Sequence, residues 1–92
     1  MNGSELIKLI IERVIEIQEL SGREVPDDVN EKTVPIGGLA GFDSLNGLEL
    51  SIMLPEEIGW SGKNVCVSDD GKKALSIGEI VESLLENHNP SN

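Results

Sequence analysis

One run carries the clearest helical pattern in this chain: Ser4-Glu-Leu-Ile-Lys-Leu-Ile-Ile-Glu-Arg-Val-Ile-Glu-Ile-Gln-Glu-Leu20. At about 100° per residue, its acids and one lysine form a narrow stripe, made of Glu5, Lys8, Glu12, Glu16 and Glu19. The rest, from Leu6 through Ile17 and Leu20, is apolar except for Arg13. So wide an apolar face must contact more than one neighbouring element, which predicts a small helical bundle. The helix is expected over residues 4–20, and Ser21-Gly22 ends it because Gly tolerates the left-handed terminus.

A long connection follows, from residue 21 to residue 42, with two Pro, four Gly and no sustained helical pattern. A connection of this length in a compact domain is often functional when it is ordered. Its Gly37-Gly38-Leu39-Ala40-Gly41 segment lacks the Gly-Lys-Ser/Thr ending of a phosphate-binding P-loop, so it is interpreted as a flexible turn. Several apolar residues predict that the connection is pinned across the bundle: Val25, Val29, Val34, Ile36 and Leu39.

A second helix is predicted over about residues 44–58, with Asp43 as its N-cap. Pro55 removes one backbone donor, so a kink or an early end is expected there. The core face is predicted to hold Gly47, Leu50, Leu54 and Ile58. A different face carries Leu45, Leu48 and Ile52, interleaved with Glu49 and Glu56. This second face fits either a helix squeezed between two others or an exposed apolar patch rimmed by acid, as a docking surface needs.

The remaining segments complete a single all-α domain over residues 1–92, with three main helices and a short one. Residues 59–66 are interpreted as a loop anchored by Trp60, and a short helix is expected at about 68–73. Ser76-Ile77-Gly78-Glu79 is a capping box, which starts a helix over about 76–86. The tail, 87–92, is polar and expected to fray. The last helix is predicted to face inward with Ile77, Ile80, Val81, Leu84 and Leu85.

The charge balance excludes several classes of partner. Seventeen acids against seven bases give a net charge of −10, so the basic footprint that DNA or RNA binding needs is missing. Anionic membrane surfaces are disfavoured for the same reason, and no apolar run approaches the roughly 20 residues that span a bilayer, so no stable membrane insertion is expected. A basic protein partner is the better expectation. The single Cys and the lack of a basic signal region predict a reduced, cytoplasmic, soluble protein, expected to be a monomer.

No self-contained catalytic centre is predicted, and the chain is not expected to be an enzyme. The only His, His88, lies in the polar tail, so neither a serine nor Cys66 has a structured base. Cys66 lies between two valines and is interpreted as a small buried hydrophobe. One His and one Cys cannot fill a structural zinc site. Asp69-Asp70-Gly71 resembles a calcium loop only superficially, because no ligand spacing follows, so no metal site is predicted.

Ser44 is the residue that invites a functional interpretation. It opens the second helix, and a helix N-terminus carries unpaired N–H groups and a partial positive charge that favour a phosphate. A serine there suits the attachment of a phosphate-linked group better than catalysis. Taken alone, without further context, Ser44 is better interpreted as an ordinary residue of the first helical turn.

The surrounding sequence, Gly41-Phe42-Asp43-Ser44-Leu45, resembles the Gly-x-Asp-Ser-Leu motif of the acyl carrier protein family. The resemblance covers about residues 4–86 in helix order, loop length and motif position. It continues through Leu48, Glu49, Leu50, Leu54, Glu56 and Ile58, through Val67-Ser68-Asp69-Asp70, and into the capped last helix.

The resemblance implies a four-helix bundle without catalysis of its own. Ser44 would receive a 4′-phosphopantetheine arm from a phosphopantetheinyl transferase, next to Asp43 and Leu45. The arm's thiol would carry an acyl group as a thioester for acyl-transferring or acyl-modifying enzymes of fatty-acid, lipid or specialised acyl biosynthesis. Basic patches of these enzymes would dock on a surface formed by Asp43, Leu45, Leu48, Glu49, Ile52, Glu56 and Glu57.

The chain also departs from the family's pattern. Asn46 and Pro55 occupy positions that are acidic in well-known members, and residues 59–66 look like a short insertion. Gly47 costs about 1 kcal/mol of helix propensity relative to Ala, which suggests close packing or local flexibility. These departures favour a specialised carrier that serves one pathway. An aminoacyl carrier of the D-alanyl or peptidyl type, and an unmodified carrier-like interaction module, remain as alternatives.

Overall fold

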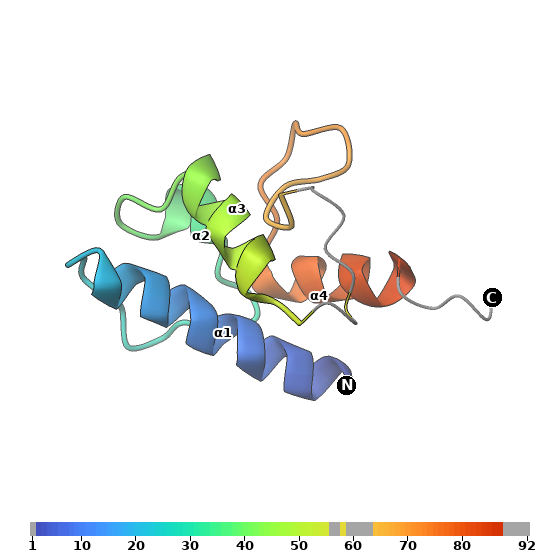
Figure 1. Ribbon diagram of the computed structural model, residues 1–92, viewed down its shortest axis with the longest axis horizontal. Coiled ribbons are helices and arrows are strands. Elements are labelled where there is room, and N and C mark those ends of the chain that lie inside the picture. The colour runs from blue at the N-terminus through green and yellow to red at the C-terminus, as the bar shows by residue number, and fades with distance from the viewer. Residues whose placement is uncertain (1, 56–57, 59–63, 88–92) are drawn as a thin grey trace.

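Helices make up most of the ordered structure in the computed structural model, which describes residues 2–55, 58 and 64–87 (Figure 1). They are α1 (Gly3–Leu20), α2 (Pro35–Gly38), α3 (Ser44–Met53) and α4 (Ile77–Asn87). Helix α1 contacts both α3 and α4, as its wide apolar face predicts. Within the described ranges no β-strand forms beyond one isolated antiparallel bridge. The all-α fold class predicted from the sequence is therefore confirmed.

Helix α1 begins and ends at local signals in its sequence. Asn2 Oδ1 accepts a hydrogen bond from Glu5 N at 2.8 Å, and Glu5 Oε1 accepts one from Asn2 N at 3.1 Å. At the other end Gly22 takes the left-handed conformation (φ +69°), as expected. Leu20 was expected to belong to the apolar packed face, but it is 80% exposed at the end of the helix, so that prediction is wrong. The buried face is formed by Leu6, Ile10, Val14, Ile17 and also Gln18.

The long connection is pinned to the bundle, as its apolar residues predict. Leu39 is buried, and Val29 and Ile36 pack partly against the core. Ile77 N donates to Thr33 O, and Gly78 N donates to Glu31 O, both at 2.8 Å. These two bonds fasten the connection to the first turn of α4. The short element α2 lies within this connection, and two of its four residues, Ile36 (ψ 116°) and Gly37 (φ 90°), have non-helical backbone angles. It lies in a different place from the short helix predicted at about 68–73.

Helix α3 ends early, in front of Pro55. Its last residue is Met53, and Leu54 is already extended (φ −81°, ψ 150°). The reason is local, because the residue before a proline disfavours the α conformation and the proline itself has no N–H to donate. The helix is therefore shorter than the predicted span of 44–58, although Leu54 and Ile58 are still buried.

A turn replaces the short helix expected at 68–73. Ser68 N donates to Lys73 O, and an antiparallel bridge joins Val67 to Ala74. Asp70 Oδ1 accepts from Lys72 N at 3.0 Å and from the Ser68 hydroxyl at 2.6 Å, and Ser68 Oγ accepts from Lys73 N at 3.1 Å. Serine and aspartate side chains that bond the nearby backbone in this way compete with a helix and favour a turn. The helix prediction is wrong here for that reason.

Helix α4 starts at the predicted capping box. Glu79 Oε1 accepts from Ser76 N at 2.9 Å, and Ser76 Oγ accepts from Glu79 N at 3.2 Å. The Lys73 ammonium, 2.8 Å from Glu79 Oε2, and the Ser76 N–H lower the pKa of Glu79 to about 2. Leu85 was predicted to face inward but is 39% exposed. The side chains that do point inward are Ile77, Ile80, Val81 and Leu84.

Two further predictions concern burial and the membrane. Cys66 is fully buried, as expected, and burial raises the pKa of its thiol to about 12. None of the helices in the described part of the chain has the length and apolar character needed to cross a bilayer. The predictions made for Trp60 and for the tail after residue 87 fall outside the described residues.

Candidate functional site

The first turn of α3 is closed by a reciprocal cap. Asp43 Oδ1 accepts from Leu45 N at 3.0 Å and from Asn46 N at 3.2 Å, and Asn46 Oδ1 accepts from Asp43 N at 3.2 Å. This confirms Asp43 as the N-cap and shows that Asn46 completes a capping box. The structure therefore fixes the backbone on both sides of Ser44.

Ser44 is exposed at the first position of this helix. Its carbonyl oxygen accepts from Asn64 Nδ2 at 2.9 Å, whereas its hydroxyl makes no hydrogen bond with any described residue. Because Asp43 provides the cap, the Ser44 hydroxyl has no structural task in the helix start. A group attached to this oxygen would disturb no hydrogen bond of the described fold.

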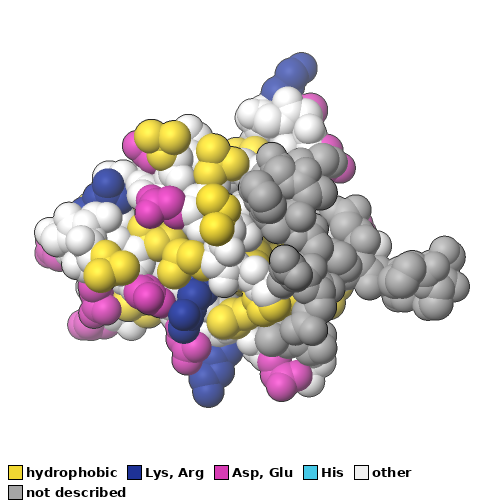
Figure 2. Space-filling view, in the orientation of Figure 1, with side chains coloured by type: hydrophobic (Ala, Val, Ile, Leu, Met, Phe, Trp, Pro, Cys, Tyr) yellow, Lys and Arg dark blue, Asp and Glu magenta, His cyan; other side chains and the backbone are white. Residues whose placement is uncertain are grey.

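Two large apolar side chains project from α3 into solvent. Leu45 is 68% exposed and Ile52 is 67% exposed, and Leu48 between them is half-buried. Because these side chains are exposed and not packed between two helices, this face of α3 fits the exposed apolar patch rather than a helix squeezed between two others. Hydrophobic side chains gather over α3 in Figure 2, with acidic ones between them. The patch begins at the residue next to Ser44.

The acids predicted for the docking surface are partly engaged within the chain. Asp43 serves as the cap, and Glu49 Oε1 accepts from Asn46 Nδ2 at 2.6 Å. Both residues are nevertheless exposed at the surface. Glu56 and Glu57 lie outside the described residues.

Behind this turn lies a polar cluster that the sequence did not reveal. Arg23 Nη1 donates to Asn46 Oδ1 at 2.9 Å and to Gln18 Oε1 at 3.2 Å, and Gln18 Nε2 donates to Ala40 O at 2.8 Å. Gln18 is fully buried. One signal was available, since Gln18 is a polar residue that falls on the apolar face of α1, four residues after Val14. Its partners could not be known without the fold.

Gly47 is explained by the close approach of Asn64. A Cβ at residue 47 would collide with the side-chain amide of Asn64, lying 2.7 Å from Nδ2. Asn64 uses that amide twice, because Nδ2 bonds Ser44 O and Oδ1 accepts from Cys66 N at 3.0 Å. Ser51 adds a third connection, donating to Gly47 O and accepting from Val65 N. The close packing suggested by a glycine within this helix is confirmed.

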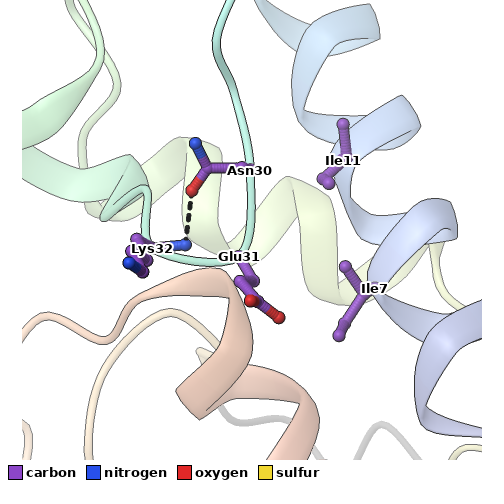
Figure 3. A pocket seen from close by; sticks show the side chains of 5 residues that line it. All are labelled: Ile7, Ile11, Asn30, Glu31 and Lys32. Carbon is purple, nitrogen blue, oxygen red and sulfur yellow. Dashed lines mark hydrogen bonds between the residues drawn. The ribbon is translucent and has the colours of Figure 1, made fainter.

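A pocket of about 390 Å³ lies elsewhere, between α1 and the long connection (Figure 3). Ile7 and Ile11 of α1 line one side, and Asn30, Glu31 and Lys32 line the other. None of these residues belongs to α3 or to the turn that precedes it. Among the residues that the structure describes, no group of three or more potential metal ligands comes together. The candidate site is therefore the start of α3 and its exposed face.

No protein family, curated protein or solved structure matches this chain.

Proposed function

We propose that this protein is a carrier that holds acyl groups on a 4′-phosphopantetheine arm attached to Ser44. The observation that carries the proposal is the state of the Ser44 hydroxyl: it is exposed at the first position of α3 and takes no part in the cap. This serine lies within the Gly41-to-Leu45 sequence that resembles the family's attachment motif.

The electrostatics of the helix start suit a phosphodiester. The first N–H groups of a helix carry partial positive charge, and a phosphate close to them is stabilised. The Asp43 carboxylate opposes this effect, but its Oδ1 already accepts hydrogen bonds from the N–H groups of Leu45 and Asn46. The exposed position of Ser44 leaves room for a transferase to reach its hydroxyl.

The attachment step is a phosphoryl-group substitution at coenzyme A. The Ser44 oxygen forms a bond to the phosphorus that bears the pantetheine unit, and the bond from that phosphorus to the neighbouring phosphate oxygen breaks. Adenosine 3′,5′-bisphosphate leaves with the electron pair, and the hydroxyl proton passes to a base of the transferase or to solvent. Once attached, the arm supplies a thiol that holds an acyl group as a thioester. A tethered cargo of this kind reaches partner active sites at high effective concentration.

The exposed side of α3 supports docking through apolar contact with a basic rim on the partner. Leu45 and Ile52 offer the apolar contact, and Asp43 and Glu49 offer the negative charge. In the described part of α3 there is one acid and no base, so the electrostatic share of docking is modest. This composition fits a carrier dedicated to few partners.

The test is covalent modification measured by intact mass. The protein is incubated with a broad-specificity phosphopantetheinyl transferase and coenzyme A, and a gain of one phosphopantetheine unit is expected. Ser44→Ala should abolish the gain, whereas Ser21→Ala, at an exposed serine outside the motif, should leave it unchanged. An unmodified wild-type protein, or a gain that survives Ser44→Ala, would refute the proposal. The first result would favour the unmodified interaction module.

A further inference from the structure

We infer that Arg23 is the positioning residue for Ser44: its guanidinium joins the end of α1 and the 40–41 turn to the first turn of α3. The inference rests on the proposed function, because it assigns a role in presenting Ser44 for modification. It starts from the polar cluster behind α3, which neither the capping of α3 nor the exposed apolar patch requires.

The backbone of Arg23 is fixed before its side chain makes any contact. Arg23 N donates to Gln18 O at 2.9 Å, and Gly22 N donates to Glu19 O at 3.0 Å, within the left-handed turn that ends α1. The arginine side chain therefore leaves a rigid point of the fold. Arg23 is half-buried, and the hydrogen bonds of its guanidinium to Gln18 and Asn46 are partly buried.

From that point the guanidinium reaches the cap of α3. Arg23 Nη1 donates to Asn46 Oδ1 at 2.9 Å, and the same oxygen accepts from Asp43 N. The other end of the Asn46 amide donates to Glu49 Oε1 at 2.6 Å. Asn46 is thus held in one orientation, with its oxygen toward Arg23 and its nitrogen toward the carboxylate. Since hydrogen bonds to a charged group are stronger than neutral ones, Arg23 stabilises the side chain that closes the capping box around Ser44.

The guanidinium also lies against the turn that leads into α3. Gly41 has φ +66°, and a Cβ there would lie 2.8 Å from Arg23 Nε. The absence of a side chain at residue 41 lets the arginine pack on the backbone two residues before Asp43. Gln18, bonded to the same Nη1, holds the carbonyl of Ala40. Arg23 therefore limits the motion of the turn from one side and the cap from the other.

The sequence offers a matched control in Arg13. Its half-buried guanidinium lies 3.0 Å from Glu16 and 3.8 Å from Glu12 on α1, and among the described residues it forms no hydrogen bond or ion pair with α3. Arg13→Met and Arg23→Met remove the same charge and the same donors and keep a comparable apolar stem. Arg23→Lys restores the charge without the planar group that packs on Gly41.

The first measurement is amide hydrogen exchange on the unmodified protein, under conditions where circular dichroism shows every variant folded. Arg23→Met should reduce the protection of the Leu45 and Asn46 amides by about tenfold relative to α4, whereas Arg13→Met leaves it unchanged. Arg23→Lys should recover part of the loss. A loss that is equal in α3 and α4, or no loss in Arg23→Met, would overturn the inference.

The second measurement is the kinetics of transferase-catalysed modification with coenzyme A. Arg23→Met should lower kcat about tenfold with KM within about twofold, because the exposed docking face is intact while Ser44 is less well placed. An unchanged kcat, or a change in KM alone, would overturn the role of Arg23. A wild-type protein that is never modified refutes the proposed function instead, and the exchange data still decide whether Arg23 orders the start of α3.

Discussion

The packing of Gly47 against Asn64 makes a sharp prediction about stability. Gly47→Ala normally stabilises a helix interior by about 1 kcal/mol, because Ala has the higher helix propensity. Here the new methyl group would occupy the space of the Asn64 amide, so Asn64 must move. The substitution therefore sets an intrinsic gain against lost tertiary contacts.

The size of the effect follows from the bonds that Asn64 gives up. It donates to Ser44 O at 2.9 Å and accepts from Cys66 N at 3.0 Å, and each bond contributes about 1 kcal/mol. Two lost bonds outweigh the helix gain, so Gly47→Ala should lower the free energy of unfolding by about 1 kcal/mol. For a domain of this size that corresponds to a Tm lower by about 4–8 °C.

The assay is urea unfolding followed by circular dichroism, in wild type and in an Asn64→Ala background. Once Asn64 no longer fills the space, Gly47→Ala should become stabilising by about 1 kcal/mol, so the two substitutions are coupled by about 2 kcal/mol. The reversal of sign is the decisive feature. If Gly47→Ala stabilises the wild-type protein, or has the same effect in both backgrounds, Asn64 does not determine the choice of glycine.

Three further outcomes are expected. Leu45→Ala should change the free energy of unfolding by less than about 0.5 kcal/mol, but it should lower the efficiency of transferase modification. Leu50→Ala removes a fully buried side chain and should lower the free energy of unfolding by about 2–5 kcal/mol. Equal losses in urea unfolding would contradict this assignment of faces. The pKa of Glu79 is lowered to about 2 in the folded protein, so the stabilisation that Glu79 provides is complete above its ordinary pKa of 4.5 and is lost as the pH falls toward 2. Glu79→Gln should therefore flatten the pH dependence of the free energy of unfolding between these values. A pH profile parallel to that of the wild type would exclude Glu79 as the source of this dependence. Burial raises the pKa of the Cys66 thiol to about 12, so a thiol reagent should label it slowly in buffer and rapidly in concentrated urea; fast labelling of the folded protein would show that the site is open.

Features with a local cause could be predicted from the sequence. Asp43 caps α3, Ser76 and Glu79 cap α4, and Pro55 ends α3 early, because each of these effects involves residues that are near one another in the chain. The turn at 68–73 also has a local cause, because the side chains of Ser68 and Asp70 accept hydrogen bonds from the backbone of Lys73 and Lys72 and so favour a turn over a helix. A pattern of apolar spacing does not register that competition.

The contacts around the candidate site depend on residues that are far apart in the sequence. Arg23 and Asn46 are 23 residues apart, and Asn64 and Ser44 are 20 apart. Charge and polarity alone assign Arg23 and Asn46 to the surface, because a polar residue is buried only when the fold brings it a partner. The sequence from Gly41 to Leu45 could be singled out, but the long-range contacts around Ser44 could not.

The two backbone bonds from α4 to the long connection divide that connection into parts that differ in their tolerance of insertions. Thr33 O accepts a hydrogen bond from Ile77 N, and Glu31 O accepts one from Gly78 N. Residues inserted at 31–33 would therefore detach the start of α4. Residues 26–28 are exposed and hold no such bond to another element. Extra length inserted there leaves every interhelical contact in register. A fluorophore-bearing loop or an affinity tag placed at residues 26–28 should therefore report on the protein without altering the helix that bears Ser44.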